Sequence, residues 1–159
     1  MSGGRCETCL PGGLRRTRQE CDLRRKQPDS GVEPARLDSD LTFESEEWRY
    51  RDSYFGSTDF LGQETVWFGT EPVWAENYYG YIIRPDLIDA NRAGVTIKAA
   101  LSAIYQEGRF LGGFDWSGPH GHYQDRSPGA LTHFRGREVI LVSGIEAYAL
   151  DYCGGLIKS

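Results

Sequence analysis

The sequence predicts an α+β fold, in which an antiparallel β-sheet of about six to eight strands carries one main helix on one face. Aromatic residues alternate with polar ones in short runs, turn residues separate these runs, and one segment has a helical period. The chain has 159 residues, and all of its aromatic residues lie at Phe43 or later. Because a core needs large apolar side chains, we expect a single globular domain over residues 37–159, preceded by a disordered basic tail over residues 1–36.

Charge is distributed unevenly between these two parts. Residues 1–36 hold 8 basic and 5 acidic side chains, a net charge of +3, whereas residues 37–159 hold 10 and 18, a net charge of −8. The acidic balance argues against direct nucleic-acid binding by the folded domain. The sequence has no membrane-spanning apolar run and no apolar secretory stretch, and its four cysteines are too scattered for a disulfide framework. We therefore expect a cytoplasmic protein, without a membrane association and without a cofactor.

An antiparallel meander is predicted in the first half of the domain. Its strands are expected over residues 48–55, 60–68 and 73–83, because aromatic and β-branched residues are frequent there. Glycine-containing turns at residues 56–59 and 69–72 connect them.

The second half is predicted to contain the helix and a hairpin. Apolar residues at helical spacing from Ile97 to Tyr105 predict a helix over residues 95–106, which Gly108 ends. A shorter helix is expected over residues 86–91, since Pro85 suits a helix start. The glycine-rich segment 110–119 is interpreted as a loop, and short strands are expected over residues 121–125 and 130–134. A final hairpin pairs residues 137–142 with 145–153 through a Ser143-Gly144 turn.

Two carboxylates on the predicted meander are candidate catalytic residues. Strand alternation places Asp52 on one face with Tyr54, and Glu64 on one face with Phe60. A carboxylate among aromatic side chains must be paired, protonated or directed into a cavity. Asp52 and Glu64 are therefore either an acid–base pair in a shared pocket or structural partners of nearby arginines. Glu76 is expected to face solvent.

Aromatic and amide side chains of the meander are candidate ligand-binding residues. Tyrosine and tryptophan combine a large apolar area with one polar group, which suits them to ligand pockets as well as to cores. The candidates are Tyr54, Trp67, Trp74, Asn77 and Tyr78.

Three histidines are weak candidates for a metal site. His120 and His122 lie on one side of an extended segment, and His133 is a possible third ligand. An ordinary exposed turn explains the first two without a metal and the third ligand is not indicated by any motif, so no metal is predicted.

The meander carries a resemblance to a known family. The runs Tyr50–Gly56 (YRDSYFG), 60–64 (FLGQE), 72–74 (PVW) and 77–80 (NYYG), with the ending 152–158 (YCGGLIK), resemble a bacterial and archaeal domain-of-unknown-function family, number 5680. Members of that family occur alone or fused to helix-turn-helix regulators. The resemblance implies a sensor or partner module beside transcriptional regulation, and it implies no reaction.

Three functions follow as hypotheses. The first is a binding module that holds a small molecule or a protein partner on one sheet face, with Asp52, Glu64, Trp74, Asn77 and Tyr78. The second is a small hydrolase-like enzyme that uses the Asp52/Glu64 pair. The third is an antitoxin-like domain that binds a protein through exposed aromatic side chains.

Overall fold

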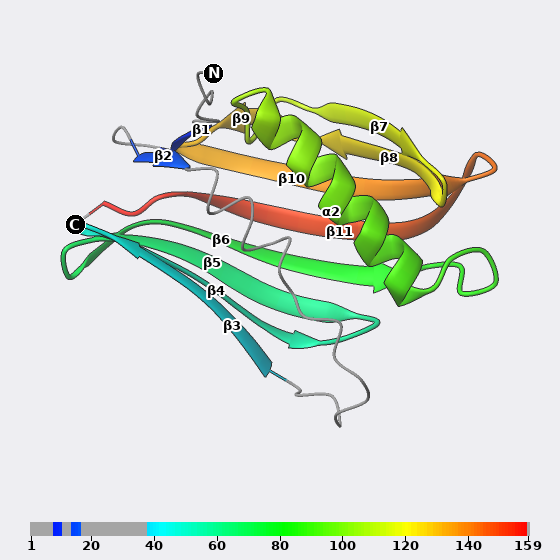
Figure 1. Cartoon of the computed structure of the whole chain (residues 1–159), viewed down its shortest axis with the longest axis horizontal. Coiled ribbons are helices and arrows are strands. Elements are labelled where there is room, and N and C mark those ends of the chain that lie inside the picture. The colour runs from blue at the N-terminus through cyan, green and yellow to red at the C-terminus, as the bar shows by residue number, and fades with distance from the viewer. Residues whose placement is uncertain (1–7, 11–13, 17–37, 159) are drawn as a thin grey trace, which may run out of the picture.

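A nine-stranded antiparallel sheet with one long helix across a face forms most of the protein (Figure 1). The structure is a computed structural model, and it describes residues 8–10, 14–16 and 38–158. The strand order is β3-β4-β5-β6-β11-β10-β8-β7, with β9 paired to β10 at one end. The α+β class and the helix on one face are thus confirmed, while the sheet is larger than the six to eight strands predicted.

The elements of the sheet follow the chain closely. Their bounds are β3 (Asp38–Ser45), β4 (Trp48–Gly56), β5 (Phe60–Phe68), β6 (Glu71–Ile82), β7 (Phe114–Gly118), β8 (Gly121–Arg126), β9 (Gly129–Ala130), β10 (His133–Val142) and β11 (Ile145–Leu156). Strands β4, β5 and β6 form the predicted meander.

Two strands of the nine-stranded sheet were absent from the sequence prediction. Strand β3 is mostly polar, and its strand conformation depends on pairing with β4, where Phe43 lies opposite Tyr50. Strand β7 lies inside the segment predicted to be a loop. Its Phe114 and Trp116 alternate with exposed polar residues, but flanking glycines conceal this short pattern. The strand expected over residues 130–134 is instead divided between β9 and the continuous β10.

Helix α2 (Ala90–Gln106) is longer than predicted. The expected helix over residues 86–91 is wrong for its first part, because Pro85 and Asp86 lie in a turn and Asp89 caps α2 instead. The Asp89 carboxylate accepts a hydrogen bond from the Arg92 backbone N–H at 2.8 Å, as an N-cap should. No helix within the described ranges is long and apolar enough to cross a bilayer.

The apolar core forms two clusters on the sheet face that α2 covers, here called the inner face. The larger cluster packs Ala93 and Ala100 of the helix against Tyr123, Ile140 and Tyr148 of the sheet. The smaller cluster contains Val66, Trp74 and Phe134 near the opposite end of the strands. Several residues of the larger cluster also line the cavity that forms the candidate site.

The segment expected to be a disordered tail is described only in part. Strands β1 (Thr8–Leu10) and β2 (Leu14–Arg16) pair antiparallel as a separate two-stranded sheet. The other residues of the segment 1–36 lie outside the described part, and so does the basic cluster Arg24–Lys26.

The predicted hairpin turn at Ser143-Gly144 is confirmed, and it yields a test of turn chemistry. Both residues have positive φ angles, 52° at Ser143 and 79° at Gly144, as a type I′ turn requires.

Asparagine tolerates this conformation better than serine. We expect Ser143→Asn to raise the free energy of unfolding by roughly 0.5–1 kcal/mol in urea denaturation. Ser143→Val, which is β-branched, should lower it; equal stability of both variants would contradict this account of the turn.

Candidate functional site

A cavity of about 640 Å³ lies between the inner face and α2. Strands β3, β4, β5, β6, β8, β10 and β11 supply its floor, and α2 supplies the opposite wall. Its volume is within the range of small-molecule sites. Polar side chains contribute strongly to the floor, which separates this cavity from an ordinary packing defect.

Three carboxylates form a row across the floor of the cavity. Asp52 on β4 lies directly opposite Glu64 on β5, and Glu64 lies directly opposite Glu76 on β6. Their residues are 6%, 4% and 7% exposed, and all three line the cavity. We call them the acidic row. Like charges at directly opposed strand positions destabilise a sheet unless other groups offset them.

Two further carboxylates form an acidic pair on the other half of the floor. Asp125 on β8 lies directly opposite Glu138 on β10, and both residues are buried and line the cavity. The Ser127 hydroxyl donates a hydrogen bond to Asp125 Oδ2 at 2.7 Å and accepts one from the Gly112 backbone N–H at 3.0 Å. The acidic pair is therefore tied to the loop that follows α2.

Tyrosine hydroxyl groups donate hydrogen bonds to both the acidic row and the acidic pair. Tyr78 donates a hydrogen bond to Asp52 Oδ1 at 2.5 Å, and Tyr152 donates one to Asp125 Oδ1 at 2.7 Å. Tyr148 also lines the cavity, and its hydroxyl is buried without a hydrogen-bond partner in the described structure. A buried hydroxyl without a partner costs free energy, so it marks a place where a ligand group could bind.

Glycines in the strands make room for these rings. A Cβ atom at Gly62 would lie 2.3 Å from Tyr78 Oη, and one at Gly136 would lie 2.0 Å from Tyr152 Cζ. Each tyrosine therefore lies across the backbone of a neighbouring strand, where only glycine leaves space. This arrangement directs the two hydroxyl groups toward Asp52 and Asp125.

Burial strongly alters the titration of the tyrosines. Burial raises the pKa of Tyr123 and Tyr148 far above their ordinary value of 10.0, and the nearby Glu138 carboxylate raises both further. Burial and Asp125 raise the pKa of Tyr152 in the same direction. These hydroxyl groups therefore remain protonated donors at neutral pH.

Four of the residues proposed from the sequence come together in the cavity. Asp52, Glu64, Tyr54 and Tyr78 all line it. Asp52 and Glu64 are neighbours across the β4–β5 pair, as the shared-pocket interpretation requires.

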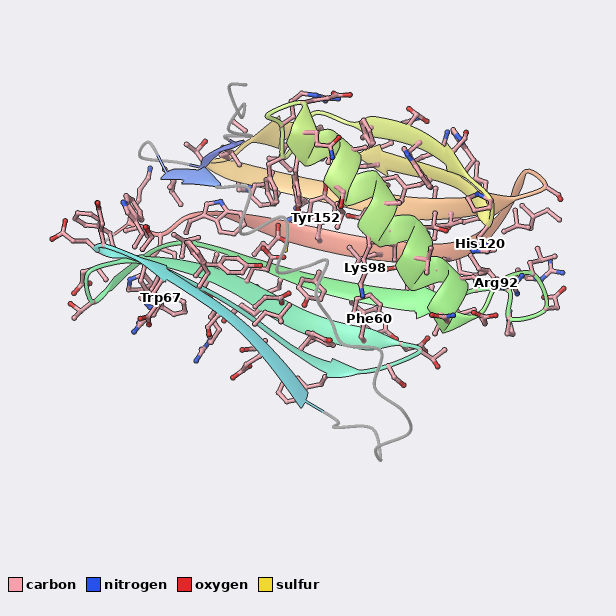
Figure 2. The ribbon with its side chains drawn as sticks, viewed as in Figure 1. Phe60, Trp67, Arg92, Lys98, His120 and Tyr152 are labelled. Atoms are coloured by element: carbon pink, nitrogen blue, oxygen red, sulfur yellow. The ribbon has the colours of Figure 1, made fainter. Side chains whose placement is uncertain are left out.

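The other three proposed ligand-binding residues do not line the cavity. Trp74 belongs to the smaller core cluster, where its indole N–H donates to the Leu131 carbonyl at 3.2 Å. Asn77 is exposed on the face away from α2 and accepts a hydrogen bond from Gln63 at 2.9 Å. Trp67 lies near one end of the sheet (Figure 2), with the Arg49 guanidinium 4.6 Å from its ring centroid.

The expectation that Glu76 faces solvent is wrong. Its strand position matches those of Trp74 and Tyr78, so it points to the inner face and is 7% exposed. Sequence reasoning also missed Asp125, Glu138 and the tyrosines of the second half of the sheet. The signal was present in alternation, because Asp125 follows Tyr123 by two residues and Glu138 precedes Ile140 by two.

The three histidines do not form a cluster. His120 lies at the turn between β7 and β8, at the opposite end of the sheet from Trp67 (Figure 2). His122 on β8 pairs with Leu141, which is eight residues along β10 from His133, a separation of about 25 Å at ordinary strand spacing. His122 instead contacts Asp115 and Ser117 at 3.2 and 2.8 Å. No group of three His, Cys, Asp or Glu side chains in the described ranges is placed to hold a metal ion.

The comparison with protein families agrees with the resemblance seen in the sequence. Residues 52–157 match the family model described as Domain of unknown function (DUF5680), so the chain belongs to this family. The matched segment begins at Asp52 in the acidic row and contains almost the whole floor of the cavity. No curated protein and no solved structure matches the chain.

The contact between Gly62 and Tyr78 can be tested by adding one methyl group. We expect Gly62→Ala to displace the Tyr78 ring from Asp52 and to lower the free energy of unfolding by about 1–3 kcal/mol. Chemical denaturation measures the loss. The matched control is Gly94→Ala, because a Cβ atom at Gly94 meets no atom within 4 Å, so this variant should be as stable as the parent or more stable. Gly69→Ala is unsuitable as a control because Gly69 has a positive φ angle. A Gly62→Ala variant as stable as Gly94→Ala would contradict the proposed packing.

The buried tyrosines predict a loss of stability in alkali. Above pH 10, the unfolded chain releases protons from Tyr123 and Tyr148, while the native chain retains them. Each should therefore remove about 1.4 kcal/mol of stability per pH unit above 10. Tyrosinate absorbance near 295 nm should show these tyrosines ionising only together with unfolding. Full ionisation of all nine tyrosines in a still-folded protein would exclude this burial.

Proposed function

We propose that this chain is a small-molecule-binding module whose ligand occupies the cavity between the inner face and α2. The observation that carries the proposal is the combination of a cavity of about 640 Å³ with a floor of buried carboxylates and tyrosine hydroxyl groups. Ligand sites typically combine an apolar lining with a few convergent polar groups in this way. The apolar part of the lining includes Phe60, Ile97 and Leu101.

Stability alone does not account for this arrangement. Protein interiors are close-packed, and buried carboxylates cost free energy even when they are hydrogen-bonded. An apolar floor of the same shape would hold α2 on the sheet at lower cost. The polar floor therefore supports a role in ligand recognition. The Tyr78 and Tyr152 hydroxyl groups hold the Asp52 and Asp125 carboxylates in position for this role by hydrogen bonding.

One observation favours a second candidate, a hydrolase-like enzyme. Asp52 and Glu64 lie opposite each other and both line the cavity, which is the arrangement that acid–base catalysis by two carboxylates needs. The two functions differ in the fate of the bound compound. An enzyme converts the compound that it binds, and Asp52→Asn should then abolish conversion.

A thermal-shift panel tests the proposed function on the full chain. The panel contains nucleotides, sugars, amino acids, carboxylic acids and amines. A compound that occupies the cavity at about 100 times its dissociation constant should add about 2.7 kcal/mol of stability. This corresponds to a rise in Tm of roughly 5–10 °C for a chain of this size.

A matched pair of helix variants locates the binding site. Ser102 lines the cavity and Gln106, one turn further along α2, does not. Ser102→Trp should remove the thermal shift, whereas Gln106→Trp should retain it. If no compound in the panel stabilises the folded protein, or if Ser102→Trp binds as well as Gln106→Trp, the cavity is not a ligand site. Product analysis of a stabilising compound, with Asp52→Asn as the control, separates binding from catalysis.

A further inference from the structure

The hydroxyl group of Tyr148 on β11 indicates what kind of molecule the cavity accepts. Tyr148 is 1% exposed and lines the cavity, and its hydroxyl group has no hydrogen-bond partner among the described residues. We propose that this hydroxyl group is the polar point of a subsite for a neutral, mostly apolar molecule, whose carbonyl oxygen accepts its hydrogen bond. This inference rests on the proposed function and names its ligand class.

The packing of two aromatic rings over a glycine fixes the place of this hydroxyl group. Tyr148 lies opposite Ile82 on β6, and its ring extends over Gly80 of the same strand. A Cβ atom at Gly80 would lie 2.6 Å from Tyr148 Oη and 2.6 Å from Phe60 Cζ, so only glycine leaves room there. The Phe60 and Tyr148 rings are nearly parallel, at 20°, with 6.5 Å between their centroids. The hydroxyl group therefore lies over β6, beside Phe60.

The surroundings of the Tyr148 hydroxyl group are apolar. Tyr148 belongs to the larger core cluster, and its cross-strand neighbours are Ile82 and Ile140. Helix α2 contributes Ile97, which packs against the same cluster and lines the cavity. A charged ligand group would lose hydration here and gain no opposite charge from these side chains. The subsite therefore favours a neutral group.

The Tyr148 hydroxyl group is a hydrogen-bond donor at neutral pH. Burial raises the pKa of Tyr148 far above its ordinary value of 10.0, and the Glu138 carboxylate raises it further, so the proton stays on the oxygen. A buried donor without an acceptor costs free energy, and an acceptor oxygen on a ligand removes that cost. A carbonyl group supplies such an oxygen without a charge and without a proton of its own.

The neighbouring tyrosines differ from Tyr148 in this respect. Tyr78 donates its proton to Asp52 at 2.5 Å, and Tyr152 donates its proton to Asp125 at 2.7 Å. Their hydroxyl groups are thus committed to carboxylates of the protein. The proton of Tyr148 has no such acceptor among the described residues, so it is the one available to a ligand.

Phe60 controls access to the hydroxyl group. Because Tyr148 has almost no exposed surface, a ligand reaches its oxygen only when a neighbouring ring moves. Phe60 is half-buried, lines the cavity and lies on the sheet below α2 (Figure 2). It directly follows the turn between β4 and β5, where exposed Ser57 and Thr58 also line the cavity. The cavity therefore meets solvent beside Phe60, and a rotation of this side chain toward the turn would uncover the hydroxyl group.

NMR titration of the full chain with acetophenone tests the inference. Acetophenone carries one carbonyl group on an apolar ring, and α-methylstyrene has the same shape with a methylene group in place of the oxygen. The affinity for acetophenone relative to α-methylstyrene should fall about fivefold in Tyr148→Phe, because this variant loses one hydrogen bond to acetophenone alone. Tyr79→Phe, on the face away from α2, should leave this ratio unchanged.

Charged analogues test the requirement for a neutral ligand. Benzoate and benzamidine resemble acetophenone in size and carry a negative and a positive charge, and each should bind at least about tenfold more weakly. Absence of acetophenone binding, an unchanged ratio in Tyr148→Phe, or equal affinity for a charged analogue would overturn the inference.

The stability of the ligand-free variants provides a second test. Tyr148→Phe removes a hydroxyl group without a described partner, so it should raise Tm. Tyr152→Phe removes a hydroxyl group that donates to Asp125, so it should lower Tm. Circular dichroism melting measures both. A lower Tm in Tyr148→Phe would show that the protein itself satisfies this hydroxyl group, and the subsite would be wrong.

The two proposals fail in different ways when acetophenone is added to the thermal-shift panel. If Ser102→Trp removes the binding of a stabilising compound but Tyr148→Phe leaves the acetophenone ratio unchanged, the module still binds a small molecule and the Tyr148 subsite is wrong. If neither acetophenone nor any other panel compound binds, both proposals are wrong.

Discussion

Buried carboxylates need hydrogen bonds or cations, and this requirement shapes the centre of the protein. Tyr78 and Ser127 each donate a hydrogen bond to a cavity carboxylate, on Asp52 and Asp125 respectively. The Ser127 hydroxyl in turn accepts hydrogen bonds from the Gly112 and Gly113 backbone N–H groups, so the loop after α2 is fixed to the same network. The larger apolar cluster packs α2 against the sheet, and the smaller cluster packs Phe110 and Leu111, which follow the helix, against the sheet.

Small and large residues alternate across strands to build the floor. Gly62 faces Tyr78, and Gly136 faces Tyr152, at cross-strand positions of the same register row. Each missing side chain gives a ring the space to lie flat, and each ring carries its hydroxyl toward a carboxylate. The polar floor therefore depends on backbone positions that themselves carry no functional group.

Much of the fold could be predicted from the sequence, because its patterns are local. Alternation identified β4, β5 and β6, the apolar stripe identified most of α2, and Ser143-Gly144 identified the final turn. Strand β3 could not be identified in this way, since its polar residues become a strand only by pairing with β4. Strand β7 was missed because glycines flank an alternation of only five residues.

The site was predictable only in part, because a cavity depends on contacts between distant segments. Alternation put Asp52, Tyr54 and Tyr78 on the correct face, but it could not show that Trp74 would be covered by Phe110 and Phe134. Asp52 and Asp125 are also far apart in the sequence, so no local pattern could place them in one cavity. Only the β6–β11 pairing joins the two halves of the sheet and brings both acidic groups into one cavity.

The order of the strands also affects how copies of the molecule meet. An open sheet has two edges whose unpaired backbone groups can recruit strands from other molecules and start aggregation. Here the edge strand β3 carries exposed Asp40 and Glu44, and the opposite edge strand β7 has only five residues. Negative charge at one edge and short length at the other disfavour edge-to-edge association, so a sheet of nine strands can remain a separate molecule at high concentration.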